Sequence, residues 1–167
     1  MSELYSECLV TKESKAKDAI TKYGLIVLTV LAVAAGLFFH PLAFVLAVGL
    51  GIADYFIIPK TDLEYEYLFV NGELDIDMIM SKTKRKKVKT LNITEADLVA
   101  PVNSHRMDYY NGNQKMKVLD YSSGNPQHKK LAIIIRDNGE ACKILIEPDE
   151  TMANAIKNSA PSKVFLD

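Results

Sequence analysis

The sequence predicts an α+β chain in which a transmembrane helical hairpin precedes an antiparallel β barrel or sandwich of about seven strands and a C-terminal helix. Three observations lead to this prediction. The segment 23–60 is apolar almost throughout. After it, apolar and polar residues alternate in several short runs, which is typical of strands with one buried face. The last run, 150–158, has helical spacing instead.

The apolar segment predicts two membrane helices that meet at His40-Pro41. Each arm holds about 16–18 residues, which reach roughly 24–27 Å and approach the thickness of a hydrocarbon core. Proline disfavours helical geometry in the preceding residue but is tolerated in the first turn of the next helix. A signal peptide that ends near Ala34 is disfavoured, because a second full-length apolar span follows at once.

Small residues recur four or eight apart in both arms, and this spacing lets helix backbones approach closely in lipid. The alternative is that glycine and alanine are simply frequent in membrane helices. Asp54 is the only charged residue inside the second arm. We expect it to form an ion pair, with Lys22 as the nearest cation, or to face water, rather than to serve transport. The predicted helix-packing residues are Gly24, Ala32, Gly36, Ala43, Ala47 and Gly51.

Lysine and arginine near the helix ends predict the orientation. Lysines precede the first arm and follow the second, whereas the apex has none. Cytoplasmic flanks are enriched in these residues, so we expect a two-span protein of the cell membrane with both termini in the cytoplasm. Residues 1–22 are expected to form a cytoplasmic leader. This leader is either an amphipathic helix, lying on the membrane or continuous with the first span, or disordered over its first ten residues.

Residues 61–167 predict the β domain. Asn71-Gly72 lies between two alternating runs and favours a two-residue hairpin, because both turn positions need positive φ. A second hairpin turn is expected at 137–140. No long helical pattern separates the runs, so an antiparallel arrangement is expected. The predicted strands cover 63–69, 74–80, 85–93, 97–102, 114–121, 130–136 and 141–146.

The C-terminal run 150–158 predicts a short amphipathic helix that ends before Pro161. Acidic residues lie in its first turn and a lysine in its last, as the helix dipole favours. Met152, Ala155 and Ile156 share one face of this helix. The two cysteines suggest neither a disulfide framework nor a metal site, and no cofactor is predicted.

The conspicuous charged feature is a run of six cations within the eight residues 82–89. One interpretation is a solvated cross-strand ladder, because the preceding hairpin supplies carboxylates opposite the lysines. The other is a surface for anionic lipid headgroups or for a protein partner, with about 1 kcal/mol per cation near a membrane. Nucleic acid is disfavoured, because no aromatic residues interleave and the net charge is −1. The six cations are Lys82, Lys84, Arg85, Lys86, Lys87 and Lys89.

The order of these elements resembles that of bacterial pleckstrin-homology-like (PH-like) domains, which are often attached to a pair of membrane helices. The residues that carry this resemblance are 65–76, 86–88 and 93–99. The whole chain is also similar to a family of uncharacterised two-span membrane proteins from Gram-positive anaerobes. The resemblance implies a fold and supplies no active site. The sequence contains no recognised nucleophile, phosphate-loop or metal-binding spacing, so we do not expect an enzyme.

Two classes of function follow from these predictions. The first is a membrane-anchored, non-enzymatic binding or scaffolding module at the cytoplasmic face that recognises a protein segment or anionic lipid. The second is an accessory subunit of a membrane transport or envelope complex that packs through the hairpin. Homo-oligomerisation is compatible with both. A groove on the β domain favours the first class, and an unpaired small-residue stripe on the hairpin favours the second.

Overall fold

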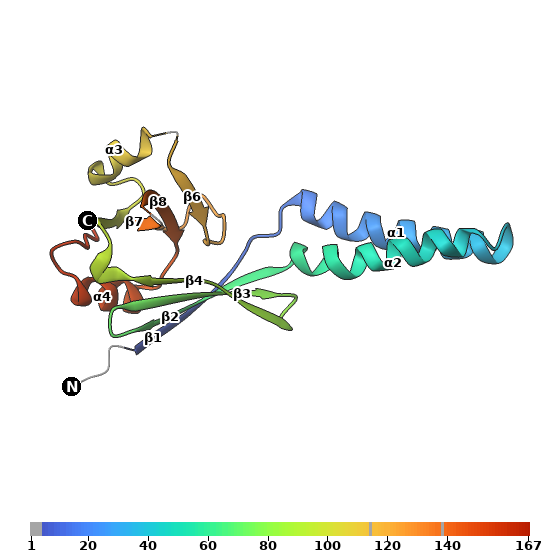
Figure 1. Cartoon of the computed structure of the whole chain (residues 1–167), viewed down its shortest axis with the longest axis horizontal. Coiled ribbons are helices and arrows are strands. Elements are labelled where there is room, and N and C mark those ends of the chain that lie inside the picture. The colour runs from blue at the N-terminus through green and yellow to red at the C-terminus, as the bar shows by residue number, and fades with distance from the viewer. Residues whose placement is uncertain (1–4, 114, 138) are drawn as a thin grey trace. The chain divides into compact units, whose positions relative to one another are not determined.

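A computed structural model of the protein describes residues 5–113, 115–137 and 139–167 (Figure 1). The chain divides into two compact units. The helical unit consists of Glu13–Leu63 and Ile79–Lys84. The β unit consists of the described residues up to Lys12 together with Glu64–Met78 and Arg85–Asp167. Each unit is described by itself.

The first sheet of the β unit has the strand order β1-β2-β3-β4. Strand β1 pairs antiparallel with β2, from Tyr5 opposite Val70 to Thr11 opposite Glu64. At the turn between β2 and β3, the Asn-Gly pair has φ angles of 49° and 94°, the positive values that the sequence predicts. The strands are β1 (Tyr5–Thr11), β2 (Leu63–Val70), β3 (Glu73–Met80) and β4 (Lys84–Asn92).

Strand β1 corrects our expectation for the leader. Residues 1–4 lie outside the described residues, but Tyr5–Thr11 is a strand and neither a helix nor disordered. Its sequence gives a poor signal, because Ser6, Cys8 and Val10 form its inward face and only Val10 is a large aliphatic residue. Its partner strand also lies far away, since Thr11 contacts a residue 53 positions later. The predicted domain 61–167 therefore lacks one strand of its own sheet, and the helical hairpin is inserted between two neighbouring strands.

The second sheet has the order β5-β7-β8-β6. Strands β5, β7 and β8 pair antiparallel, but β6 pairs with β8 in parallel. Strands β5 and β6 thus run the same way, which requires a crossover connection; here it carries η3 (His105–Met107) and α3 (Asp108–Asn111). The strands are β5 (Leu98–Pro101), β6 (Lys117–Asp120), β7 (Leu131–Asp137) and β8 (Glu140–Ile146).

The predicted α+β fold, with a helix pair, sheets of mainly antiparallel strands and a C-terminal helix, is confirmed, but the number of strands and the direction of β6 are corrected. The described residues form eight strands in two separate sheets, and no closed barrel is formed. Two positions of the predicted strand and turn, Gln114 and Asn138, lie outside the described residues. The remaining predicted strands are confirmed with shifts of a few residues at their ends.

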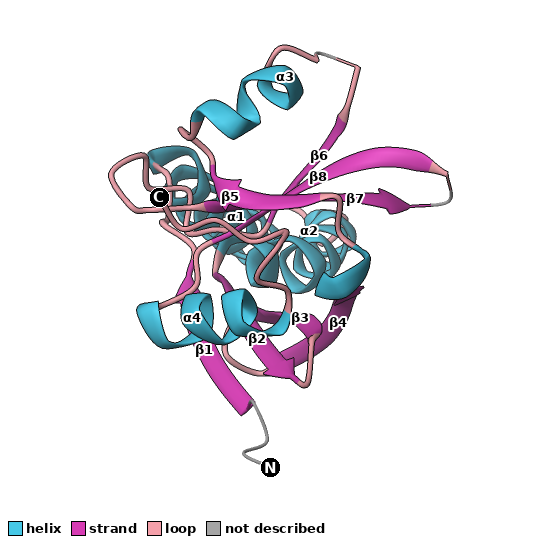
Figure 2. Cartoon of the chain, turned by 90° about the vertical axis from the view of Figure 1, so that its left-hand side faces the viewer, coloured by secondary structure: helices cyan, strands magenta, loops and turns pink. Residues whose placement is uncertain are grey.

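One hydrophobic core joins the two sheets and the C-terminal helix α4 (Glu150–Ser159). Figure 2 shows the ribbons of these sheets and of α4. Phe69 from the first sheet and Ile144 from the second are fully buried in it. The helix contributes Met152, Ala155 and Ile156, which confirms its predicted face. Asp149 caps this helix by accepting a hydrogen bond from the backbone N–H of Met152 at 2.8 Å.

Strand β7 is buried on both faces. Ile133 and its neighbours two positions away face the main core, whereas Ala132 and Ile134 belong to a second cluster with Met107 of η3. A strand covered on both sides has no polar face, so it appears in the sequence as a continuous apolar run. The crossover that makes β6 parallel to β5 is thus also the element that covers this face.

The helical unit contains the two long apolar helices α1 (Ala16–Phe38) and α2 (Ala43–Ile57), the latter extended by η1 (Ile58–Thr61). Their connection lies at the predicted apex, His40-Pro41. Both are long and apolar enough to cross a membrane. Their outer side chains remain exposed, for example Val45 at 71% and Leu46 at 62%. Most of their apolar surface is therefore not covered by other described parts of the chain.

Candidate functional site

The helix contact is closest in the half of the hairpin near its apex. Ala32, Gly36 and Ala47 are buried there, and Ala43 is half-buried. A Cβ atom on Gly36 would lie 3.0 Å from the ring of Phe44, so a side chain at this position would force the helices apart.

Gly24 and Gly51 correct our packing prediction. Both are exposed, and a Cβ atom on either would meet nothing within 4 Å. The physical reason is the helical pitch. A residue four positions further along an α-helix lies about 40° further round the helix axis. Residues at that spacing therefore leave the contact face after one or two repeats.

Asp54 is hydrogen-bonded inside the hairpin. The Thr29 hydroxyl donates to Oδ2 of Asp54 at 2.7 Å. The other carboxylate oxygen, Oδ1, is buried and has no hydrogen-bond partner among the described residues. We expected Lys22 to approach this carboxylate, but the contact comes from a residue two helical turns deeper. Thr29 was overlooked because a threonine hydroxyl in a helix usually bonds its own backbone, as this one also does to Leu25.

Half of the basic run forms ion pairs within the β unit. Burial raises the pKa of Asp75, but hydrogen bonds from Lys87 and Thr90 outweigh this effect and lower that pKa below its usual value. The Lys89 ammonium likewise lowers the pKa of Asp137. The pairs are Arg85–Glu66 at 2.6 Å, Lys87–Asp75 at 2.8 Å and Lys89–Asp137 at 2.6 Å. We call Arg85, Lys87 and Lys89 the paired cations.

The alternation of inward and outward side chains along β4 slips by one residue near Lys89. Lys87 and Thr90 both contact Asp75, although they are three positions apart. Val88 and Leu91, also three apart, both pack in the core. This pattern is typical of a β-bulge, which inserts one extra residue into a strand. The sequence pattern alone did not indicate the bulge.

The other cations, Lys82, Lys84 and Lys86, have no carboxylate partner among the described residues, and we call them the uncompensated cations. Lys82 and Lys84 lie in the helical unit, at the turn between β3 and β4. Lys84 donates a hydrogen bond to the Tyr55 hydroxyl at 2.9 Å, and its ammonium lies 4.1 Å from the centre of that ring. The turn is thereby held at the end of α2.

The turn that carries Lys82 has an unusual backbone. Ser81 and Lys82 have φ angles of 48° and 56°, in the left-handed region that residues with a side chain rarely adopt. Each such residue costs about 1 kcal/mol or more, so the surroundings must hold the turn in place. The backbone N–H of Ser81 donates to the Asp62 carbonyl at 2.8 Å, which supplies one such restraint. The strain and the contact with Tyr55 single out this turn as a candidate binding element.

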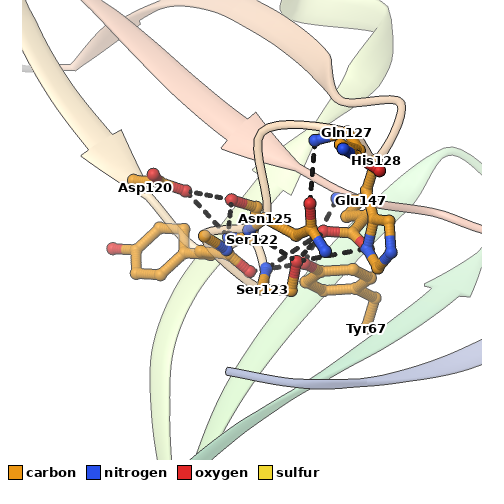
Figure 3. Close-up of polar contacts among 10 residues, drawn as sticks. Tyr67, Asp120, Ser122, Ser123, Asn125, Gln127, His128 and Glu147 are labelled. Carbon is orange, nitrogen blue, oxygen red and sulfur yellow. Dashed lines mark hydrogen bonds and ion pairs between the residues drawn. The ribbon is translucent and has the colours of Figure 1, made fainter. Parts of the chain in front are cut away.

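A polar cluster in the β unit was not foreseen from the sequence (Figure 3). Glu147 accepts a hydrogen bond from the Ser123 hydroxyl at 2.6 Å, and Nδ1 of His128 lies 2.6 Å from its other oxygen. Below it, the buried Tyr67 hydroxyl donates to the carbonyl of Tyr121 and accepts from the backbone N–H of Glu147. Burial raises the pKa of the Tyr67 phenol. These residues come from three distant segments, so no local spacing could reveal them.

This cluster does not have the geometry of a catalytic triad. In a triad the histidine ring lies between the serine and the carboxylate and uses both nitrogens. Here Ser123 and His128 bind the same carboxylate directly, and Ser123 is only 3% exposed. The cluster therefore fixes the loop between β6 and β7 to the end of β8.

That loop forms one wall of a surface groove of about 510 Å³. Its lining also includes Cys8–Val10 of strand β1 and residues 147–149. Within residues 5–113, 115–137 and 139–167, no three His, Cys, Asp or Glu side chains are arranged to hold a metal ion.

Comparison with known families identifies the chain. A family profile described as "Bacterial PH-like domain (DUF6106)" matches residues 2–166. No curated protein and no solved structure matches the chain.

Proposed function

We propose that this chain, which belongs to the bacterial PH-like domain family, is a membrane-anchored binding module. The hairpin spans the cell membrane twice and holds the PH-like sheets at the cytoplasmic face. The uncompensated cations contact anionic lipid headgroups there. The module has no enzymatic activity of its own and acts through the lipids and proteins that it binds.

The pairing of β1 with β2 is the observation that carries the anchoring proposal. The chain leaves the sheet after β1, passes through both apolar helices and returns to the neighbouring position in the same sheet. Residues before and after the hairpin must then lie on the same side of any membrane that it crosses. Lysines flank the hairpin on both sides and are absent from its apex, which favours the cytoplasm for that side.

The contact between Lys84 and Tyr55 supports the lipid proposal. Tyr55 lies in the last turn of α2, where a spanning helix reaches the membrane–water interface. Tyrosine and lysine are the residue types that favour this zone. A cation held there without a carboxylate partner is free to attract an anionic headgroup, with about 1 kcal/mol for each lysine near the surface.

The two halves of the basic run provide a matched test in the intact protein. We would place the full chain in nanodiscs of neutral or anionic lipid and measure its thermal unfolding. Anionic lipid that binds only the folded state raises the unfolding temperature. Replacing Lys82, Lys84 and Lys86 with Gln should abolish this difference between lipids. Added salt should reduce the difference in the unchanged protein.

The control removes the same amount of charge from the paired cations. Replacing Arg85, Lys87 and Lys89 with Gln should lower the unfolding temperature in both lipids and leave the difference between them intact. If the unchanged protein unfolds at the same temperature in both lipids at low salt, the lipid contact is wrong. Equal effects of the two triple substitutions on the difference would contradict the assignment to the uncompensated cations.

The accessory-subunit function remains the second candidate, and Asp54 is the observation that favours it. A buried carboxylate oxygen without a hydrogen-bond partner is costly, and Oδ1 of Asp54 has none among the described residues. Repacking against another spanning protein could supply the missing donor. Purification of the full chain from its native membrane should then retain a spanning partner in fixed ratio, and replacing Asp54 with Leu should release it.

A further inference from the structure

The four outer edges of the two sheets differ in how well they are protected against pairing with an additional strand. An open edge presents unpaired N–H and C=O groups to any strand that can add to it, and lysines or short strands suppress this. β4 carries five of the six cations, and β6 has only four residues. β5 is covered by the C-terminal segment, where Val99 bonds with Lys163 and Phe165.

β1 has none of these protections. It has seven residues, contains neither lysine nor proline, and carries Glu7 as its only charge. Among the described residues, its backbone pairs with β2 on one side and has no backbone partner on the other. Two large apolar side chains on its outer face remain exposed, Tyr5 at 59% and Leu9 at 56%.

The surface groove lies along this open edge. Its lining includes the consecutive residues Cys8, Leu9 and Val10, so backbone as well as side chains of β1 borders it. No residue of β2 lines it, which places it on the side of β1 that β2 leaves free. The cluster around Glu147 holds the opposite wall in place. A groove of about 510 Å³ has room for a few residues of extended chain.

The charged side chains that line the groove differ in whether other groups of the protein already bind them. Glu147 is bound by Ser123 and His128. Asp149 caps α4, whose positive dipole end it faces. Lys129 is exposed and has no ion-pair partner in the part of the chain that the structure describes. Lys129 is thus the charged side chain of the lining that no hydrogen bond or ion pair among the described residues engages.

We propose that β1 binds an extended segment of a partner protein as an additional strand, with an acidic residue of that segment facing Lys129. Backbone hydrogen bonds to the free edge of β1 supply affinity. Apolar side chains at alternate positions of the segment pack on Tyr5 and Leu9, as cross-strand neighbours do. The proposal rests on the function as a binding module but not on the lipid contact.

Selection from a displayed library of random nine-residue segments tests this proposal on the full chain in neutral nanodiscs. Selected segments should alternate apolar with other residues and carry an acidic residue near one end. A synthetic peptide of the selected sequence should bind the Leu9→Lys variant of the full chain about tenfold or more weakly than the unchanged chain. The reason is that a lysine on an edge strand opposes strand addition. Val118→Lys is the matched control, since Val118 is 49% exposed on edge strand β6. It should leave binding unchanged.

Lys129→Glu tests the charge preference independently of Leu9. The acidic peptide should bind this variant roughly threefold more weakly, the size of one exposed ion pair. A new selection on the variant should favour a basic residue at the same position. Because Lys129 lies on an exposed loop, this variant keeps the test valid even if Leu9→Lys does not fold.

Three results would overturn the proposal. The first is that no sequence is enriched over empty nanodiscs. The second is that selected peptides bind Leu9→Lys and the unchanged chain equally. The third is that the full chain is a dimer that Leu9→Lys converts to a monomer, since the edge would then be occupied by a second copy. Peptide binding is measured in neutral lipid, so a failure of the chain to bind peptide is independent of whether anionic lipid stabilises it.

Discussion

The β unit and the helical unit differ in where their large apolar side chains lie, buried in the first and exposed in the second. In the β unit, Tyr67 and Phe69 are fully buried between two sheets. In the helical unit, small residues form the contact, while large ones such as Val45 and Leu46 face outward. The first unit therefore contains its own core, whereas the second leaves most of its large apolar side chains exposed. In the chain, the helical unit is inserted between β1 and β2, two neighbouring strands of the β unit.

The largest effect should come from separating the two units along the sheet pairing. Replacing residues 13–62 with Asn-Gly would join Lys12 to Leu63 by a two-residue hairpin turn that matches the β1–β2 register. We expect this chain to be soluble, rich in β structure and to unfold cooperatively in urea. Removing residues 1–12 from it as well should abolish cooperative unfolding, because the sheet loses β1 and the buried Val10.

Comparing these two chains also tests our sequence prediction, a domain of residues 61–167, against the structure, in which β1 belongs to the same sheet. If the chain without residues 1–12 unfolds as cooperatively as the chain that contains them, the domain is complete at 61–167 and β1 is dispensable. Far-ultraviolet circular dichroism during the urea titration provides the measurement for both.

A smaller effect distinguishes buried from lipid-facing side chains. Phe69→Ala should reduce the free energy of unfolding by about 3–5 kcal/mol, because it leaves a cavity in the core. Val45→Ala should change stability by less than about 0.5 kcal/mol, because the Val45 side chain is largely exposed. Unfolding of both variants as full chains in detergent micelles would check this, and a comparable loss for Val45→Ala would show that its face is a protein contact.

The difference between the units also explains how far the sequence alone could predict the structure. The strands from β2 to β8, helix α4 and the apex at His40-Pro41 follow from local patterns, because turns and periodicity are encoded within a few residues. Strand β1 could not be assigned this way, since its burial depends on a partner beyond the hairpin. The same holds for the parallel pairing of β6.

The candidate sites were harder to predict from the sequence than the fold was. The basic run was visible, but its division into paired and uncompensated cations depends on the slip in β4 and on the contact between Lys84 and Tyr55. The groove combines β1 with loops more than a hundred residues later, and no spacing rule connects them. Within the hairpin, Thr29 was hidden by the apolar residues around it.

An intermediate effect inside the helical unit concerns Thr29. Thr29→Val keeps the shape of the side chain but removes the donor to Asp54. We expect the helix contact to weaken by about 1–2 kcal/mol, the upper range for a hydrogen bond between membrane helices. Thr29→Ser should retain most of the stability. Unfolding of the full chain by added sodium dodecyl sulfate in mixed micelles measures this, and equal losses for both variants would exclude the hydrogen bond as the cause.

The smallest effect should be the acid sensitivity of the β unit. Lys87 and Thr90 lower the pKa of Asp75, and Lys89 lowers that of Asp137, both from an ordinary value of 3.8. The folded state therefore binds fewer protons, so this stabilisation is complete above the ordinary pKa and is lost as the pH falls below it. Replacing both aspartates with Asn should flatten the decline in unfolding temperature below about pH 4. An unchanged decline would show that other carboxylates cause it.

The orientation of the hairpin is the central claim, and site-specific labelling tests it most directly. Cys8 and Cys142 would be replaced with Ser and Ala, and a single cysteine placed at Asp167 or at His40, the apex. In intact cells, a membrane-impermeant maleimide should label the apex cysteine but not the C-terminal one. After the membrane is opened, both should react. Labelling of the C-terminal cysteine in intact cells, or protection of the apex, would contradict a two-span anchor with the PH-like sheets in the cytoplasm.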